Sequence, residues 1–287
     1  MSTRRPRVMG IVNVTPDSFS DGGLFADADR AADHGRQLLA DGADLLDVGG
    51  ESTRPGAIRP VVSEELDRVI PVITQLAAEG AVVSVDTMRA SVAAAALTAG
   101  AQVVNDVSGG LADPEILEVV AHSDATYVAM HWRAHATDMQ AFTDYGPHGV
   151  VEGVRRELGE RLDAIVAAGI EPERVLLDPG LGFAKTPQHN WELLRALASI
   201  QSLGRPLLIG ASRKSFLGSL LAVDGEPRAV GEREFAHVAL VALLAQRGVD
   251  CLRVHDVRAT CDALAVVDAL AAGGFATVGG VRQGEAS

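Results

Sequence analysis

Two basic side chains near the C-terminus are spaced so that they can act together on an anion. Arg253 and His255 stand two residues apart on an expected strand, so both side chains leave the same face. After the preceding apolar run, GASRKSFLG places Lys214 and Ser215 at an expected helix start, where free backbone N–H groups favour negative charge. Surface ion pairs with neighbouring aspartates are the alternative for Arg253 and His255. In so acidic a chain, a convergent basic cluster favours a phosphate ligand.

A second set of polar residues ends three other apolar runs. Asp86, Asn105 and Asp178 close the runs VVSVD, VVN and VLLD. Their oxygens can accept hydrogen bonds from a ligand edge rich in N–H donors, such as a 2-amino-4-oxo pyrimidine ring. A divalent metal cage is the weaker alternative, because such cages usually need more oxygen ligands than these residues supply. Turn formation or helix capping explains any one of these residues alone, whereas several polar strand ends together indicate a binding site.

Eight short apolar runs recur along the chain, and six of them end in Asn, Asp or His. They are continuous rather than alternating, which is typical of parallel strands covered on both faces. Helical stretches separate them, and this order favours a closed (β/α)8 TIM barrel, a single domain of class α/β, over an open sheet. The loops after the strands form the active site of such barrels. The first run, MGIVN, therefore puts Asn13 at the rim of the mouth.

Local signals predict where helices begin and end. Ser63 is predicted to cap a helix that ends at Gly80, and Pro71 is expected to kink or break it. Asn190 is predicted to cap a later helix that runs to Ile200. Further helices are expected over residues 27–40, 88–99 and 149–168. The barrel should occupy residues 1–272, and the Gly-rich segment 273–287, which lacks periodicity, is expected to be a disordered tail.

Composition argues against several classes of protein. With 25 basic and 38 acidic side chains, the formal net charge is −13, which repels nucleic acid and anionic membranes. Two cysteines outside any CxxC pair are too few for a disulfide framework and suit a reducing cytosol. No apolar run approaches the roughly 20 residues needed to span a bilayer. We therefore expect a cytoplasmic protein that binds small molecules, and neither nucleic acid nor a membrane.

Seven motifs, taken together, resemble one known family. In chain order, from residue 8 to 257, they are VMGIVNVTPDSFSDGG, DVGGESTRPGA, VSVDT, VVNDVSGG, LLDPGLGFAK, GASRKSFLG and LRVHDV. This series is similar to the successive signatures of the dihydropteroate synthases. The resemblance implies a commonly dimeric (β/α)8 barrel that condenses (7,8-dihydropterin-6-yl)methyl diphosphate with p-aminobenzoate. The products would be 7,8-dihydropteroate and pyrophosphate, in folate synthesis, and sulfonamides should compete with p-aminobenzoate.

The resemblance also implies a role for each matching residue. The pterin would be held deep in the barrel by Asp86, Asn105, Asp178 and Lys214. The diphosphate itself would be bound by Arg253 and His255, and Asn13 would contribute to the Mg²⁺ that accompanies it. Thr53 would be a further contact of the pterin diphosphate. The p-aminobenzoate pocket would include Pro55, Phe183, Lys214 and Ser215. The catalytic residues, which would bind the substrates and stabilise the charges that develop, would be Asp86, Lys214, Arg253 and His255.

Two loops would complete the site according to the same resemblance. Residues 14–23 and 52–56 would close over the diphosphate and exclude water that could capture a pterin-methyl cation. The residues that would order these loops are Thr15, Asp17, Asp21, Arg54 and Pro55.

Two other functions stay open beside this one. A pterin-dependent methyltransferase domain would share the barrel and the acidic pterin pocket, but it has no need of the SRKS and STRPG segments. A non-catalytic pterin-binding paralogue is the other alternative, and the intact Asn13, Lys214 and His255 argue against it.

Three features need separate interpretations. Glu234 and Phe235 stand where the family commonly has small residues near its dimer contact, which bears on the geometry of the expected homodimer and not on catalysis. His131 and His135 have the spacing of a helical zinc pair, but they follow a strand directly, so a loop near the site is the better interpretation. Cys251 is expected to be an inert core residue.

Overall fold

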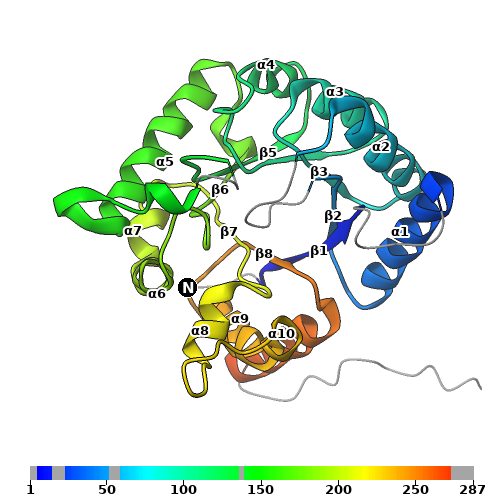
Figure 1. Cartoon of the computed structure of the whole chain (residues 1–287). Helices are drawn as coiled ribbons and strands as arrows, with labels where there is room; N and C mark the ends of the chain where they lie inside the picture. The colour runs from blue at the N-terminus through cyan, green and yellow to red at the C-terminus, as the bar shows by residue number, and fades with distance from the viewer. Residues whose placement is uncertain (1–4, 15–22, 52–58, 136–138, 273–287) are drawn as a thin grey trace, which may run out of the picture.

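Strands alternate with helices along the chain (Figure 1). This computed structural model describes residues 5–14, 23–51, 59–135 and 139–272. Within these residues, eight strands form one parallel sheet. They are β1 (Arg7–Asn13), β2 (Leu45–Gly49), β3 (Val83–Asp86), β4 (Val103–Asp106), β5 (Thr126–Met130), β6 (Val175–Asp178), β7 (Leu208–Ile209) and β8 (Cys251–Val254).

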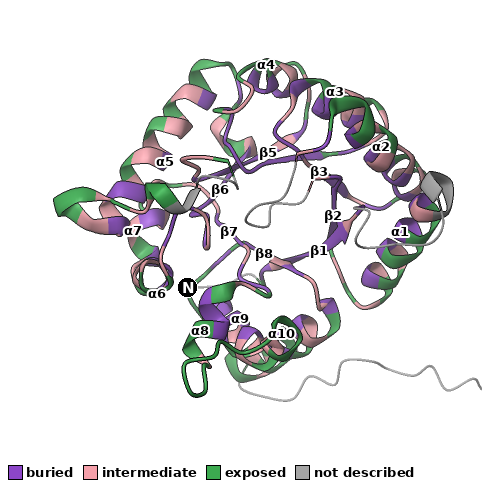
Figure 2. Cartoon of the chain, in the orientation of Figure 1, coloured by how far each residue is buried: buried purple, intermediate pink, exposed green. Residues whose placement is uncertain are grey.

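Helices surround the strands and cover their outer face. Those of the described ranges are α1 (Gly23–Ala40), α2 (Val62–Ala78), α3 (Ala90–Thr98), α4 (Glu115–Ala121), α5 (Gly149–Ala167), α6 (Pro187–Arg195), α7 (Leu197–Gln201), α8 (Ser215–Leu220), α9 (Glu234–Gln246) and α10 (Val257–Ala271). Figure 2 shows that the strands are mostly buried, whereas the helices expose their outer sides. None of the helices in the described part is long and apolar enough to cross a membrane.

The sheet closes into a barrel. Its strands follow the order β6-β5-β4-β3-β2-β1-β8-β7, and β1 pairs with both β2 and β8. A parallel bridge between Leu177 and Leu207 joins the two ends of this order, and the backbone N–H of Leu177 donates to the Pro206 carbonyl at 3.0 Å. The predicted (β/α)8 TIM barrel is therefore confirmed. The predicted tail, residues 273–287, lies outside the described residues.

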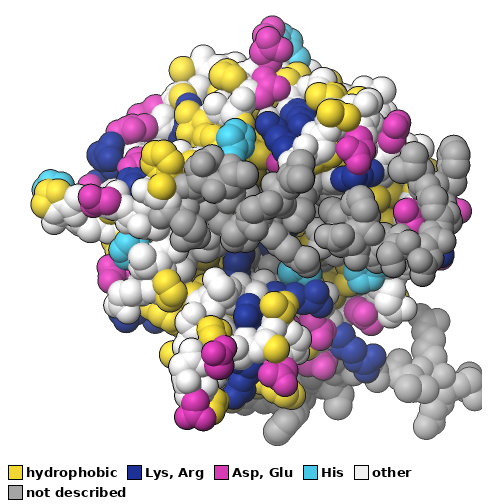
Figure 3. All heavy atoms as spheres, viewed as in Figure 1, with side chains coloured by type: hydrophobic (Ala, Val, Ile, Leu, Met, Phe, Trp, Pro, Cys, Tyr) yellow, Lys and Arg dark blue, Asp and Glu magenta, His cyan; other side chains and the backbone are white. Residues whose placement is uncertain are grey.

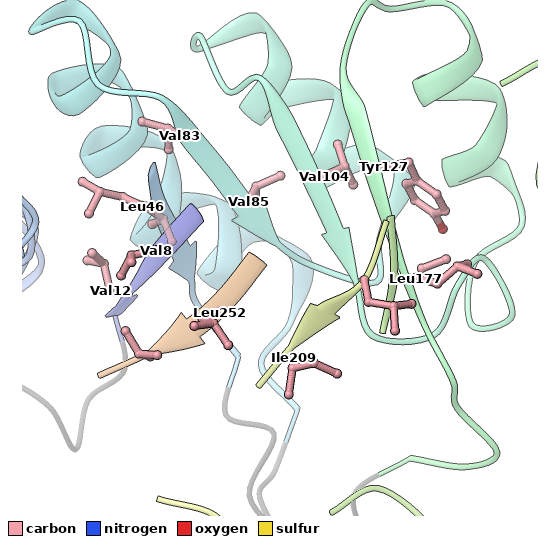
Figure 4. Packing of buried hydrophobic residues seen from close by; sticks show 14 of the residues in the cluster. Val8, Val12, Leu46, Val83, Val85, Val104, Tyr127, Leu177, Ile209 and Leu252 are labelled. Carbon is pink, nitrogen blue, oxygen red and sulfur yellow. The ribbon is translucent and has the colours of Figure 1, made fainter. Parts of the chain in front are cut away.

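Side chains alternate between the two faces of each strand, and this alternation builds the barrel in layers. The outward set packs beneath the helices, as Figure 4 shows for Val8, Leu46, Val83, Val104 and Leu252. The inward set forms an apolar cluster of Met9, Leu45, Val103, Val128, Leu176, Leu208 and Cys251. On several strands the inward residue two positions further along is polar, so this cluster becomes the floor of a polar site.

One prediction about α2 is wrong, and one of the two outcomes expected at Pro71, a break, is absent. Ser63 does not precede the helix, because α2 already begins at Val62. Pro71 lies inside α2 and does not break it. The buried side chains of Val69, Val72 and Ile73 hold this stretch against the barrel, and such packing outweighs the local cost of the proline.

The predicted cap at Asn190 is also wrong. α6 begins earlier, with Thr186 as its cap, and the Thr186 side chain accepts a hydrogen bond from the backbone N–H of His189 at 3.2 Å. The expected single helix is divided into α6 and α7. Asn190 is buried inside α6, where its side-chain oxygen accepts from the Gly182 backbone N–H at 2.7 Å. Asn190 therefore fixes the loop that follows β6.

Candidate active site

The polar strand ends meet above the apolar floor, as the sequence predicts for a barrel mouth. Asp86 pairs in register with Asn105 on β4 and with Gly49 on β2. A Cβ added at Gly49 would lie 3.3 Å from the Cβ of Asp86, so the glycine leaves room for that side chain. Arg253 pairs with Met9 of β1 on the other side of that strand, and its long side chain reaches Asp86 from β8.

Arg253 joins these residues into one hydrogen-bonded cluster. Its Nε donates to the Oδ2 atom of Asp47 at 2.6 Å, and its Nη2 donates to the Oδ2 atom of Asp86 at 2.7 Å. The side-chain nitrogen of Asn105 donates to the same oxygen of Asp47 at 2.9 Å. We call Asp47, Asp86, Asn105 and Arg253 the Arg253 cluster. The alternative of surface ion pairs with Asp250 or Asp256 is wrong for Arg253, because its partners are the carboxylates of the barrel interior.

Asp47 was not among the residues predicted from the sequence. Its side chain is fully buried, and its Oδ1 atom has no hydrogen-bond partner among the described residues. Asp47 stands in the middle of the run LLDVG rather than at its end. A carboxylate inside an otherwise apolar strand was the available signal, because a buried charge requires a partner.

The Arg253 cluster contains two carboxylates and one guanidinium, and this excess of acidic groups affects the pKa values of Asp86 and Arg253. Burial raises the pKa of Asp86 to about 7; the Arg253 charge opposes that shift, and the Asp47 carboxylate adds to it. Burial alone would lower the pKa of Arg253, but Asp47 and Asp86 reverse the effect and raise it. Arg253 therefore stays charged. Asp86 is partly protonated near pH 7, and a ligand that donates a hydrogen bond to it would favour its ionised form.

A second group of site residues lies around Asp178. Its Oδ1 atom accepts a hydrogen bond from the Gly180 backbone N–H at 2.7 Å. Burial raises the pKa of Asp178, although this bond and the charge of Lys214 limit the rise. The Nζ atom of Lys214 lies 4.2 Å from the centre of the Phe183 ring, within the range of a cation–π contact. The predicted residues Asp178, Phe183 and Lys214 thus occur together.

His255 lies beside the loop after β7. Its Nδ1 atom is 3.0 Å from the hydroxyl of Ser212, a residue without a role predicted from the sequence. Burial, followed by the charges of Arg213 and Arg253, lowers the pKa of His255 to about 3, so the imidazole is neutral at pH 7. Ser215, at the first position of α8, is exposed.

The predicted metal ligand, Asn13, is half-buried at the C-terminal end of β1, opposite Gly49 of β2. No group of three or more His, Cys, Asp or Glu side chains within the described ranges is placed to hold a metal ion. The remaining predicted residues lie outside the described residues: Thr15, Asp17, Asp21, Thr53, Arg54 and Pro55.

Two secondary expectations agree with the structure. His131 and His135 lie in the loop after β5; His131 contacts Glu157 and Lys185, and the His135 ring packs against Trp132 with centroids 5.0 Å apart. Cys251 is fully buried, and burial raises the pKa of its thiol to about 12, so it is unreactive.

The surface around the barrel mouth carries charges of both signs. On the face in Figure 3, Lys and Arg side chains alternate with acidic and apolar ones, without a broad basic area on the part drawn in colour. Positive charge is instead local, at Arg253 inside the barrel and at Lys214 and the exposed Arg213 after β7.

Comparisons with known proteins identify relatives. The family model for pterin binding enzyme matches residues 9–255. A dihydropteroate synthase of Mycobacterium leprae is 51% identical over 270 residues, which cover 94% of this chain and 95% of that protein. A solved structure of Xanthomonas albilineans dihydropteroate synthase with 4-aminobenzoic acid has a TM-score of 0.86 and 47% identity, and covers 95% of each chain. Another, in complex with 7,8-dihydropteroate, has a TM-score of 0.82 and 44% identity over 95% of this chain and 96% of that chain.

The two lysines of the chain, Lys185 and Lys214, are expected to titrate near neutral pH. Burial lowers the pKa of Lys185 to about 7 and that of Lys214 to about 8, from the ordinary value of 10.5. In the unfolded chain both stay protonated up to about pH 10.5, so they make the free energy of unfolding rise with pH from about 7 to 10.5. Because the sequence has no other lysine, selective isotope labelling gives two side-chain nitrogen signals to follow by NMR.

The variant Lys185→Met should remove one of these signals and thereby assign both. Two signals that titrate together near the pKa of a free lysine would contradict the burial of these ammonium groups.

Proposed function

This chain belongs to the dihydropteroate synthases of the pterin binding enzyme family, and from this membership we propose which of its residues perform each part of the reaction. It is a transferase: it joins (7,8-dihydropterin-6-yl)methyl diphosphate to p-aminobenzoate, giving 7,8-dihydropteroate and pyrophosphate. The observation that carries the assignment of roles is the Arg253 cluster, which places acidic and basic groups side by side in the barrel mouth. Membership in this family sets aside the methyltransferase alternative.

The pterin ring binds at Asp86, Asn105 and Asp178. Each of these side chains keeps one oxygen without a hydrogen bond from the described residues, namely Oδ1 of Asp86, Oδ1 of Asn105 and Oδ2 of Asp178. A 2-amino-4-oxo pyrimidine edge supplies N–H donors for these oxygens, and Lys214 supplies a donor for the ring carbonyl. Such donors favour the ionised carboxylate, so binding lowers the raised pKa of Asp86.

The diphosphate binds at Arg253 and His255. The Nη1 atom of Arg253 and the Nε2 atom of His255 make no hydrogen bond with the described residues, whereas the other nitrogens are already held. These donors stabilise the negative charge that grows on the leaving group as its C–O bond breaks. The amine nitrogen of p-aminobenzoate then forms the new C–N bond and gives up one proton.

Asn13 is the candidate magnesium ligand. Mg²⁺ usually takes one or two protein oxygens and completes its shell with water and substrate phosphates, so a single amide at the rim fits this ion. When bound, Mg²⁺ would neutralise negative charge on the diphosphate. Thr53 and the loop residues Thr15, Asp17, Asp21, Arg54 and Pro55 keep the roles predicted for them.

The p-aminobenzoate site is assigned to Phe183, Lys214 and Ser215. The Phe183 ring supplies an apolar face next to the cationic Lys214. An aromatic ring that carries a carboxylate matches this pairing, because its face packs on Phe183 while its charge is attracted to Lys214.

The first prediction from this proposal concerns turnover. Pyrophosphate should be released only when pterin diphosphate, p-aminobenzoate and Mg²⁺ are all present, and a sulfonamide should compete with p-aminobenzoate. A coupled pyrophosphate assay, with each component withheld in turn, measures this. Folded protein that binds pterin but releases no pyrophosphate would favour the non-catalytic paralogue instead.

The second prediction concerns the pterin pocket. Asp178→Ala removes charge-assisted hydrogen bonds in a buried site, which should cost about 3 kcal/mol of pterin binding, on the order of a hundredfold in Kd. Isothermal calorimetry measures the loss. Asp163→Ala, which removes an exposed carboxylate of α5, is the matched control and should bind pterin like the unchanged protein. Equal affinities for Asp178→Ala and the control would exclude Asp178 from the pocket.

The chain is also proposed to form a homodimer through α9 and α10. Phe235 is 92% exposed, and Leu243 on the same side of α9 is 54% exposed. On α10, Val266 and Leu270 are 61% and 73% exposed. Large apolar side chains gathered on two adjacent helices are typical of a protein–protein contact. Glu234, unlike Phe235, does not point to the solvent. Its Oε1 atom lies 2.9 Å from the Nδ1 atom of the buried His237.

The third prediction tests this contact. Phe235→Asp should reduce the mass measured by analytical ultracentrifugation from a dimer to the 29.9 kDa monomer, because it places a charge in the apolar contact. Leu111→Asp changes an exposed leucine of the β4–α4 loop and should stay dimeric. A monomeric unchanged protein, or a dimeric Phe235→Asp variant, would argue against this surface.

A further inference from the structure

The chain has two lysines, and both lie at the barrel mouth. The other 23 of its 25 basic residues are arginines. Lys214 is already assigned to the substrates, whereas Lys185 has no role in the reaction described above. Lysine differs from arginine in carrying a compact charge with three donors on a flexible stem. The contacts of the Lys185 ammonium group therefore indicate what this residue does.

The ammonium group of Lys185 is buried and has two hydrogen-bond partners. The side chain is 3% exposed. Its Nζ atom donates to the Phe183 carbonyl at 2.9 Å and lies 3.0 Å from the Nδ1 atom of His131. Among the described residues, no carboxylate forms an ion pair with it. Burying an ammonium group with neutral partners is costly, so its contacts must be specific to be retained.

His131 is held in the tautomer that can receive this ammonium group. Its Nε2 atom lies 2.9 Å from the Oε2 atom of Glu157, so Nε2 carries the hydrogen and Nδ1 presents a lone pair to Lys185. Burial, followed by the charge of Lys185, lowers the pKa of His131 to about 4, which keeps the ring neutral. Burial opposes ionisation of Glu157, but hydrogen bonds from His131 and Arg133 lower its pKa to about 2.

A second connection leads from Glu157 back to the same loop. Arg133 donates to both oxygens of Glu157, at 2.9 and 2.6 Å, and its guanidinium lies 3.8 Å from the centre of the Tyr145 ring. The Tyr145 hydroxyl donates to the Ala184 carbonyl at 3.1 Å. Two consecutive carbonyls of the loop are therefore held, Phe183 by Lys185 and Ala184 by Tyr145. Together these residues form a closed ring of contacts.

The loop needs this support, because its backbone is strained. Ala184 has a φ of 48°, in the left-handed region that residues with a Cβ rarely adopt. A neighbouring side chain, that of Lys214, lies 3.2 Å from the Cβ that any residue other than glycine would carry at position 182. The loop thus approaches Lys214 closely at Gly182 and again at the Phe183 ring. A small shift of the Phe183 backbone would change the position of that ring.

We propose that Lys185 is a positioning residue for the arylamine substrate. Its buried ammonium, held between the His131 imidazole and the Phe183 carbonyl, fixes the loop that places the Phe183 ring beside Lys214. Lys185 does not touch a substrate itself and acts through Phe183. This inference rests on the proposed p-aminobenzoate site, and it adds residues from the β6–α6 loop, the β5–α5 connection and α5 to the residues that determine affinity for that substrate.

Lys185→Met tests the proposal in the complete enzyme. The substitution keeps the apolar stem and removes the ammonium group. At saturating pterin diphosphate, the KM for p-aminobenzoate should rise about tenfold, the effect of losing one hydrogen bond to the loop. The Kd for pterin, measured by calorimetry without p-aminobenzoate, should change less than about twofold. Arg195→Met, which removes an exposed charge from the end of α6, is the matched control and should leave both values unchanged.

A pair of His131 variants separates positioning from general damage to the fold. Asparagine places its oxygen near the original Nδ1 position and keeps an acceptor for Lys185, whereas glutamine reaches toward Glu157 and presents no such acceptor. His131→Gln should raise the KM for p-aminobenzoate as Lys185→Met does, and His131→Asn should stay close to the unchanged enzyme. These variants decide the question if Lys185→Met fails to fold.

Two results would overturn the proposal. One is a p-aminobenzoate KM that is unchanged in both Lys185→Met and His131→Gln. The other is an equal rise for both substrates, or an equal rise in the two His131 variants, since either indicates general loss of structure. Both results are measured against an unchanged enzyme that releases pyrophosphate. Absence of pyrophosphate release in the unchanged enzyme would instead contradict the proposed function, so the two failures are distinguishable.

Discussion

One buried guanidinium holds the polar part of the barrel mouth together. Arg253 contacts two carboxylates from different strands, and one of them, Asp47, also orients Asn105. Because one guanidinium is paired with two buried carboxylates, the carboxylate oxygens of the cluster can accept further hydrogen bonds. The pKa of Asp86 is raised for the same reason, because the charge of Arg253 does not fully offset the burial of this carboxylate. A ligand with N–H groups on one edge would supply these donors, and for this reason we propose that the inner end of the pocket binds the pterin rather than an anion.

The two-residue period of the strands explains why the site lies where it does. Residues such as Leu45 and Val103 turn inward and fill the barrel with apolar side chains, which excludes water from below. Two positions later the same strands present Asp47 and Asn105 to the interior. The charged groups are thus supported on a dry floor, where electrostatic interactions are stronger than in water.

The sequence was sufficient for the fold and for much of the site. Continuous apolar runs ending in polar residues predicted the barrel, and Asp86, Asn105 and Arg253 indeed meet in it. Details that depend on tertiary packing were not predictable, such as the unbroken helix at Pro71. Lys185 was missed for the same reason, because its partner His131 is 54 positions away in the chain.

The narrowest part of the barrel wall has a consequence for its mechanics. β7 contains two residues, and between β6 and β7 the wall is closed by the bridge of Leu177 with Leu207. This β6–β7 junction is the seam of the barrel. Asp178 lies on its β6 side and Lys214 on its β7 side, so a ligand that binds both residues would connect the two sides. A ligand bound in the mouth should thus slow hydrogen exchange of the backbone amides along the seam. The stability of the wall against local opening would then depend on whether substrate is bound.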